Sequence, residues 1–282
     1  MKDLTIIIKT YERKNILIGL LESIEKYYPD LPIIIVDDSK VNYKNDILKL
    51  FPKLNINYIV EDYNIGLSKG RNILLKNVKT KYFLLCDDDY QFDERTNLNE
   101  AMKVYKKNKI DILGGCVYNR YAFDTLYTFL WSLDSINKIK KIIKHEEFLC
   151  IYNGEYNIND SKIELSINKN FLDYSENKIY KTDICSNFFI GNTKKINEIG
   201  GWGPEILKMG EHEFFFLKCK VNNLKVYFTP IFGVCHYPKK SISYLKYRFR
   251  DNNYFKEACK MSNIERFYVH NKNTKIYLYE EK

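Results

Sequence analysis

The chain has 282 residues, of which 45% are hydrophobic and 29% charged, which is typical of a folded globular protein and excludes a mainly disordered chain. No apolar run approaches the roughly 20 residues of a membrane-spanning helix, and the first residues lack a signal-peptide pattern, so we expect a cytoplasmic protein. The seven cysteines are widely separated and form no C-x-x-C pair, which excludes a disulfide framework and a zinc cluster. The net charge of +9 comes from scattered lysines without a recognition module, so nucleic acid is not an expected partner.

Short strand-like runs alternate with helical patterns along the first ninety residues. Four runs are apolar and rich in β-branched residues, as in strands buried in a parallel sheet: residues 4–9, 32–38, 56–60 and 81–86. Apolar residues recur at helical spacing over 16–27 and again over 67–78. This order predicts an α/β fold with a Rossmann-like, doubly wound and mostly parallel sheet, whose ligands bind at the carboxyl ends of the strands.

Polar segments follow each of these four runs: KTYER, DDS, EDYNIG and DDDY. Taken alone, Asp38 with Ser39 would be a turn pair and Ser68 a helix cap, but together the segments predict one crevice. Neither a dinucleotide fingerprint nor a phosphate loop is present. Because adjacent carboxylates raise the cost of ionising one another, we expect Asp87–Asp89 to hold a divalent ion, assisted at the phosphates by Arg13 and Arg71.

Several segments together resemble a known enzyme family. The segments TIIIKTYERKNILIGLLESI, IIIVDDS, NIGLSKGRN and YFLLCDDDY match, in order and spacing, family 2 glycosyltransferases of the GT-A fold. In the second half, DICSNFFIGNTKKINEIGGW resembles the segment that shapes the sugar pocket, and KMGEHEFFFLKC resembles the acidic loop and helix that carry the catalytic base. More narrowly, SNFFIGNT with GEHEFFF resembles the catalytic domains of β-1,4-N-acetylgalactosaminyltransferases.

The resemblance implies a metal-dependent inverting enzyme that moves a hexose or N-acetylhexosamine from a UDP-sugar to a hydroxyl of a glycan or glycolipid. It implies that Tyr11 stacks near the uracil, that Asp38 accepts a hydrogen bond from the uracil edge and that Arg71 faces the diphosphate. Asp87 would lie near the ribose and the metal, with Asp89 on the metal. The remaining residues expected around the nucleotide are Thr10, Arg13, Asn64, Gly66 and Asp88.

The expected metal is Mn²⁺, with Mg²⁺ as the substitute. Alternate residues of an extended segment point the same way, so Asp87 and Asp89 can share an ion that Asp88 cannot easily reach, and Asp88 would support the site or cap a helix. His236 follows an apolar stretch, where a lone histidine is usually structural, but the resemblance implies a metal ligand after the last core strand.

Glu211 and Glu213, in GEHE, are the two candidates for the base that takes the proton from the acceptor. Acidic residues at a helix start also complement its dipole, so a purely structural role is the alternative. The family pattern has Glu-Asp here, whereas this chain departs from it with His212 beside the glutamate. We favour Glu213, keep Glu211 as the other candidate and expect His212 to support the acceptor.

We expect a UDP-binding half over 1–114, an acceptor-binding and catalytic half over 115–240, and a basic helical tail over 241–282. The tail region is either a solvated helix or a peripheral membrane contact, and Trp131 packs in the core or stacks on an acceptor sugar. A glycoside hydrolase would not need the uracil-site residues or the D-x-D strand end, and a sugar-nucleotide pyrophosphorylase would open with a Gly-rich loop that IIIKTYERK lacks. The remaining alternative is a non-catalytic carbohydrate- or nucleotide-binding protein with a vestigial site.

Overall fold

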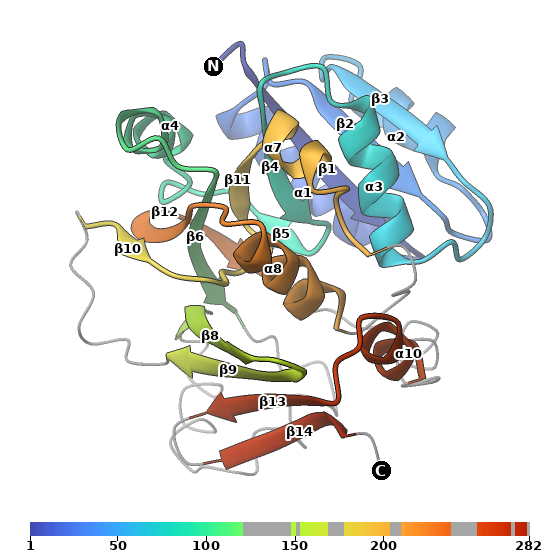
Figure 1. Ribbon diagram of the computed structural model, residues 1–282. Helices are drawn as coiled ribbons and strands as arrows, with labels where there is room; N and C mark the ends of the chain where they lie inside the picture. Colours follow the sequence, from blue (N-terminus) through green and yellow to red (C-terminus); the bar gives the residue numbers. More distant parts are fainter. Residues whose placement is uncertain are drawn as a thin grey trace, which may run out of the picture.

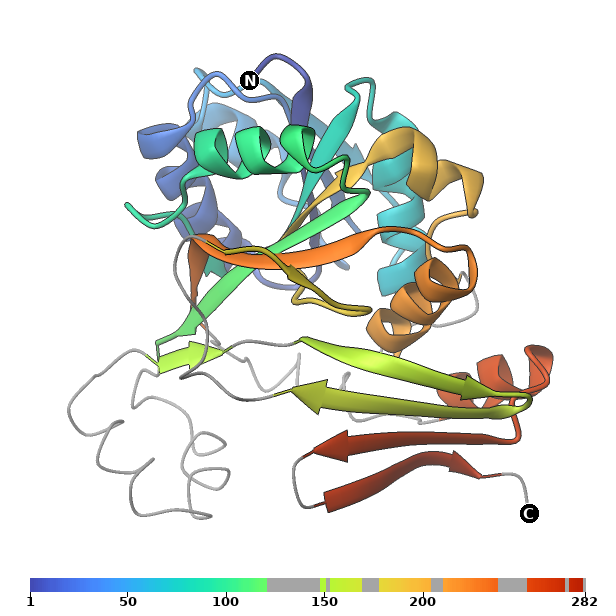
Figure 2. The same ribbon diagram turned by 60° about the vertical axis from the view of Figure 1, so that its left-hand side comes forward.

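The computed structural model describes residues 1–120, 148–150, 153–168, 178–203, 210–237, 253–271 and 274–280. Over these residues the chain forms a main sheet of ten strands and a second sheet of four. The main sheet has the order β10-β12-β6-β11-β4-β1-β2-β3, with β5 beside β12 and β7 beside β6 (Figure 1). The two sheets lie one above the other in both ribbon views (Figure 2).

The amino-terminal part of the main sheet is parallel. Its strands are β1 (Leu4–Thr10), β2 (Ile33–Asp37), β3 (Ile56–Val60) and β4 (Tyr82–Asp87). The connecting helices are α1 (Lys14–Tyr27), α2 (Lys44–Leu50) and α3 (Leu67–Asn77). Because the strands run parallel in the order β4-β1-β2-β3, their carboxyl ends meet at one edge, as the sequence predicted.

The rest of the main sheet is mixed. Its longer strands are β6 (Ile112–Asn119), β11 (Phe189–Asn192) and β12 (Val226–His236), and its short ones are β5 (Tyr90–Gln91), β7 (Phe148–Cys150) and β10 (Tyr180–Lys181). Strand β11 is antiparallel to both β4 and β6, whereas β12 runs parallel to β6. Strand β5 pairs antiparallel with the end of β12, so Tyr90 lies opposite His236.

Helices cover both faces of the main sheet, because alternate residues of its buried strands point to opposite sides. On one face, Ile6 and Ile8 of β1 share a core with α1, α2 and α4 (Leu98–Lys107). On the other face, Ile7 shares a core with α3, α7 (Thr193–Glu198) and α8 (Glu211–Val221). The continuous apolar runs seen in the sequence are therefore strands buried on both sides.

The second sheet has the order β14-β13-β9-β8. It consists of β8 (Asn153–Asn159), β9 (Lys162–Asn168), β13 (Arg266–Asn271) and β14 (Thr274–Glu280), and α10 (Asn253–Met261) precedes β13 along the chain. The prediction of a helical tail over 241–282 is therefore wrong for β13 and β14, because a parallel partner, β9, holds β13 as a strand. Residues of this sheet share the apolar core of α8, which lies between the two sheets (Figure 1).

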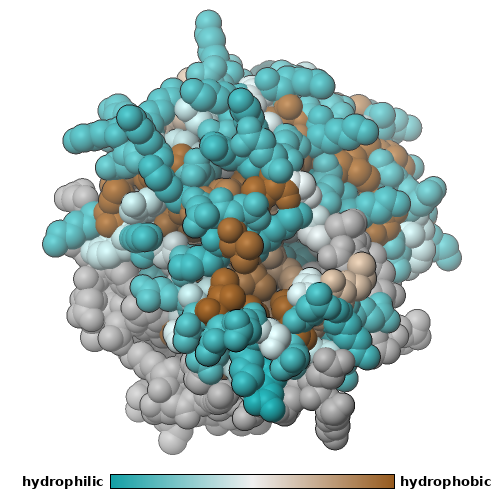
Figure 3. All heavy atoms as spheres, viewed as in Figure 1, coloured by the Kyte–Doolittle hydropathy of each residue, from teal (hydrophilic) through white to brown (hydrophobic). Residues whose placement is uncertain are grey.

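The outer surface on the side of α3, α7 and α8 is mostly hydrophilic, with hydrophobic residues gathered near its middle (Figure 3). Among the described residues, no helix combines the length and apolar character needed to cross a membrane. Trp131 and the lysines and arginines between 239 and 250 lie outside the described residues.

Candidate active site

The three aspartates that follow β4 point to different surroundings. Asp87 ends the strand and its side chain is 29% exposed. Asp88 is fully buried and accepts a hydrogen bond from the Thr10 hydroxyl over 2.8 Å. Asp89 lies in the turn before β5 and its side chain is 14% exposed. Asp88 thus points inward, but residues 88 and 89 form a turn rather than an extended segment, so Asp87 and Asp89 bond to different partners.

His236 faces Asp89 at the end of the last main-sheet strand. The pairing of β5 with β12 brings them together, and His236 Nε2 lies 3.3 Å from Asp89 Oδ2. His236 Nδ1 lies 2.5 Å from the Asn119 side-chain oxygen, which can only accept, so Nδ1 carries a hydrogen, and Nε2 either donates a proton to Asp89 or has a lone pair for a cation. Two acceptors at this distance need a proton or a cation between them.

An ion with bonds of about 2.1 Å separates two ligands at a right angle by about 3 Å, so the spacing of Asp89 and His236 fits an ion such as Mn²⁺ or Mg²⁺. Asp87 is turned toward other partners: its carboxylate accepts from Arg71 over 2.9 Å and from Asn187 over 3.3 Å. Within the part of the chain that the structure describes, no three His, Cys, Asp or Glu side chains form a metal-binding group.

Arg13 neutralises the other two aspartates. Its guanidinium bonds to Asp88 and donates to Asp89 Oδ2 over 2.9 Å. Burial raises the pKa of Asp88, whereas Arg13 and His236 together lower the pKa of Asp89 even though burial opposes them. The sequence predicted Arg13 near the phosphates; in this structure it is bonded to the aspartates that precede β5.

Asp38, after β2, is buried and ion-pairs with Lys9 of β1. Its other oxygen accepts from the Gly66 amide over 3.2 Å. Burial raises the pKa of Asp38 and lowers the pKa of Lys9, and each charge opposes the shift of the other. Lys9 was not predicted as a site residue, and its only sequence signal is a lysine inside an apolar run. A methyl group on Gly70 would lie 2.3 Å from Lys9 Cε, so any larger residue where α3 passes this side chain would displace the lysine.

An exposed aromatic pair borders Asp38 in the strand order. Tyr11 follows β1 and Tyr63 follows β3; their hydroxyls are 2.9 Å apart and their ring centroids 5.9 Å apart. The turn between Tyr63 and α3 has positive φ at Asn64 and Gly66, and the Asn64 amide donates to the Asp38 carbonyl over 3.0 Å. Tyr11, Asn64 and Gly66 thus lie at the strand ends around Asp38, while their contact with a nucleotide stays a prediction; Tyr63 was not among the predicted residues.

Arg71 differs most from its predicted position. The sequence placed it at the diphosphate, but its side chain is fully buried and donates to Asp87 and, over 2.8 Å, to Glu211. Burial raises the pKa of Glu211 to about 7 although Arg71 opposes the shift. A sequence cannot show this link, because the three residues belong to α3, β4 and α8.

The other two candidates at the start of α8 are less enclosed. His212 packs edge-to-face on Phe216, and burial lowers its pKa to about 3, so the imidazole is neutral at physiological pH. Glu213 is partly exposed, and its carbonyl accepts a hydrogen bond from the Tyr156 hydroxyl of β8 over 2.7 Å. The second sheet therefore contacts the turn that carries the predicted base.

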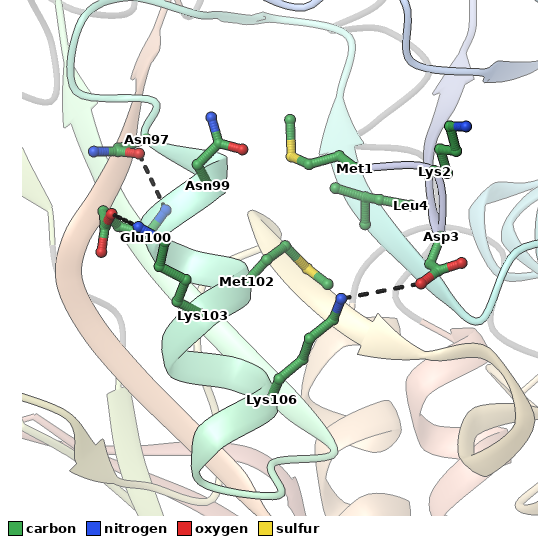
Figure 4. Close-up of a pocket in the computed structure, with 10 residues that line it drawn as sticks. All are labelled: Met1, Lys2, Asp3, Leu4, Asn97, Asn99, Glu100, Met102, Lys103 and Lys106. Atoms are coloured by element: carbon green, nitrogen blue, oxygen red, sulfur yellow. Dashed lines mark hydrogen bonds and ion pairs between the residues drawn. The ribbon is translucent and has the colours of Figure 1, made fainter.

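A hollow of about 610 Å³ lies elsewhere, between the first four residues and the start of α4 (Figure 4). It is at the amino end of β1, opposite the aspartates. Its pair Lys103–Glu100 is exposed, and Lys106 faces Asp3 at 4.0 Å. This hollow is therefore separate from the candidate site.

Comparisons with known proteins identify the family. The model of "Glycosyl transferase family 2" matches residues 5–198. The chain belongs to glycosyl transferase family 2. It is 38% identical over 126 residues to "Beta-1,4 N-acetylgalactosaminyltransferase 2" of Mus musculus, an alignment that covers 44% of this chain and 23% of that protein. The chain thus spans about a quarter of that relative's length.

Two solved structures share the fold. One is S. aureus TarS 1-349 in complex with UDP-GlcNAc, with a TM-score of 0.60 at 17% identity over 91% of this chain and 64% of that one. The other is GalNAc-T7 with UDP, GalNAc and Mn²⁺, with a TM-score of 0.60 at 15% identity over 84% and 43%. These findings confirm the predicted family and the GT-A fold, while the roles of individual residues stay predictions.

Proposed function

We propose that the protein is a metal-dependent, inverting glycosyltransferase that moves a hexose or N-acetylhexosamine from a UDP-sugar to a hydroxyl of a glycan or glycolipid. The observation that carries the proposal is the pairing of Asp89 with His236 at the carboxyl ends of the main sheet. Two acceptors that face each other at 3.3 Å form half of a cation site, and a substrate diphosphate with water would supply the remaining ligands. GalNAc-T7, which has the same fold, was solved with UDP and Mn²⁺.

The donor would lie across the strand ends. Tyr11 and Tyr63 present exposed rings beside Asp38, whose buried carboxylate retains lone pairs for the uracil edge after bonding to Lys9 and Gly66. Asp89 and His236 would hold the ion, with Asp87 at its border. The bound ion would stabilise the charge on the leaving diphosphate.

Transfer with inversion requires one carboxylate on the acceptor side. The acceptor oxygen attacks the anomeric carbon, the bond to the diphosphate breaks, and the proton of the acceptor hydroxyl moves to the base. We propose Glu213 for this role because it is partly exposed, whereas Glu211 is buried and bonded to Arg71. The neutral imidazole of His212 would border the acceptor.

The test is turnover of a set of UDP-sugars with Mn²⁺ present and after EDTA treatment, with the anomeric configuration of the product read by NMR. In Glu213→Gln we expect transfer to fall by about 10²- to 10⁴-fold, the usual contribution of a general base, with UDP affinity unchanged. A matched control is Glu100→Gln, an exposed glutamate at the opposite end of the sheet. Retention of configuration, or normal turnover after EDTA, would overturn the proposal.

UDP binding without turnover of any UDP-sugar would instead support the alternative of a non-catalytic nucleotide- or carbohydrate-binding protein. Peripheral membrane contact through the basic residues 239–250 is also a proposal. A vesicle-sedimentation assay with anionic and neutral lipids tests it, and equal binding to both would contradict it.

A further inference from the structure

Arg71 connects the two sides of the candidate site. It lies on α3, and its guanidinium divides its hydrogen bonds between two carboxylates that are far apart in sequence. Nη2 donates to Asp87 Oδ1 over 2.9 Å and Nη1 donates to Glu211 Oε1 over 2.8 Å. Asp87 ends the strand that leads to the predicted metal ligands, and Glu211 is the first residue of α8.

The burial of this cation is complete, since Arg71 has no exposed surface. A buried charge is tolerated only when it is paired and hydrogen-bonded, so both carboxylates are part of its environment. On its other side the guanidinium lies 5.8 Å from the Trp202 ring, which stacks on Phe215 of α8 at 4.4 Å. Arg71 therefore holds α8 both through Glu211 and through this ring stack.

Helix geometry separates Glu211 from Glu213. Residues four apart lie on one face of a helix, while residues two apart point in nearly opposite directions. Glu211 lies on the buried face together with Phe215, whereas Glu213 lies on a more exposed one. The first turn of α8 thus carries two carboxylates in different surroundings. Glu211 is bonded to Arg71, whereas Glu213 lies on a more exposed face of the helix.

We propose that Arg71 and Glu211 are positioning residues, which fix the first turn of α8 against the end of β4 so that Glu213 is held at a set distance from the donor. This inference rests on the proposed function. It differs from the sequence-based expectation, in which Arg71 contacts the diphosphate itself. A direct phosphate contact would act on donor affinity, whereas a positioning link acts on the rate of transfer.

The first test is kinetic and uses Arg71→Lys, Glu211→Gln and their double variant. A lysine keeps the charge but lacks the fork that reaches two carboxylates, so we expect kcat to fall about 10- to 100-fold, as for supporting residues of metal sites. UDP affinity, measured by calorimetry, should stay within about twofold. Because the two residues act as one unit, the double variant should lose no more than the worse single variant. Glu100→Gln is the control.

A weakening of UDP binding equal to the loss in kcat would assign Arg71 to the phosphates and overturn the inference. So would a double variant whose loss is the product of the two single losses, or a larger loss in Glu211→Gln than in Glu213→Gln. If Arg71→Lys does not fold, Glu211→Gln, which keeps the size of the side chain, carries the same comparison.

The second test does not require activity. Hydrogen exchange of the α8 amides from Phe214 onward should become about tenfold faster in Arg71→Lys and in Glu211→Gln, and should be unchanged in Glu100→Gln. Unchanged exchange in α8 would overturn the link even in an active enzyme. If the wild-type protein turns over no UDP-sugar but the two variants still show faster exchange in α8, the proposed function is contradicted. The link between Arg71 and Glu211 is then retained.

Discussion

Acidic residues at the ends of β2 and β4 and at the start of α8 are paired with cations in two different surroundings. Asp38 and Glu211 are buried together with Lys9 and Arg71. Asp89 is paired with Arg13, but its carboxylate is partly exposed and also faces His236 Nε2 at 3.3 Å. The two buried pairs are enclosed by the protein, whereas Asp89 and His236 present an accessible edge, where we propose that a cation binds. We therefore expect the buried pairs to act mainly on stability and the partly exposed pair to act on ligand binding.

The largest expected effect tests the buried pairs. Lys9→Met leaves the Asp38 carboxylate buried without its cation, so we expect the free energy of unfolding to fall by about 3–5 kcal/mol, measured by urea denaturation. The matched control is Lys14→Met, which removes the lysine of an exposed pair with Asp46 and should change stability by at most about 1 kcal/mol. Similar losses of unfolding free energy in both variants would contradict the expectation that a buried pair contributes more to stability than an exposed one.

Asp89→Asn tests the outer pair. The variant removes a ligand charge near the surface, so we expect turnover with Mn²⁺ to fall by about 10²- to 10³-fold, or about 3–4 kcal/mol of transition-state stabilisation. The thermal unfolding temperature without metal should stay close to that of the wild type, while its rise on adding Mn²⁺ and UDP should disappear. Asp46→Asn is the control. A variant that keeps its response to Mn²⁺ would place the ion elsewhere.

A smaller effect is expected for Asp38→Asn, which tests whether a buried residue also contacts the donor. If the carboxylate accepts from the uracil edge, the variant should bind UDP and a UDP-sugar more weakly by the same amount, about 1–3 kcal/mol. Calorimetry measures both affinities. Unchanged affinity for UDP would restrict Asp38 to its structural pairing with Lys9 and Gly66.

The last prediction concerns the direction in which stability changes with pH. Burial raises the pKa of Glu211 to about 7 in the folded protein, above the unfolded value of about 4.3, so the folded state holds this proton to higher pH. The resulting stability is fully present below about pH 4 and is lost as pH rises through about 7. Glu211→Gln should remove this dependence, so its stability relative to the wild type should improve as pH rises over that range. A flat difference between the two pH–stability curves would contradict it.

The amino-terminal half could be predicted from sequence because its information is local. Apolar β-branched runs such as 33–36 specify strands buried on both faces, and the polar residues after them must meet at one edge of a parallel sheet. The resemblance implied that Asp89 and His236 hold a metal together; the structure brings them to 3.3 Å, while the metal itself stays a proposal. In contrast, Arg71 stands in a helix-start pattern that contains no sign of its partners Asp87 and Glu211.

The carboxyl-terminal half of the second sheet, β13 and β14, was beyond sequence reasoning for a similar reason. The residues of β13 were predicted as part of a helical tail, but their conformation depends on pairing with β9. Since strand preference reflects packing and partners more than the backbone alone, a local pattern could not identify this strand. The contact between this sheet and the predicted base could not be foreseen either: the backbone carbonyl of Glu213 accepts a hydrogen bond from the Tyr156 hydroxyl of β8.

The parallel pairing of β9 with β13 also sets an order of events during synthesis. Residues 162–168 leave the ribosome well before residues 266–271, so β9 has an unpaired edge while the intervening chain is made. The strands β1 to β4 pair among themselves within the first 90 residues, so their partners are all synthesised long before β13. The strand ends that we propose bind the donor can therefore form first, and the sheet that contacts α8 is complete only when β13 and β14 have been made.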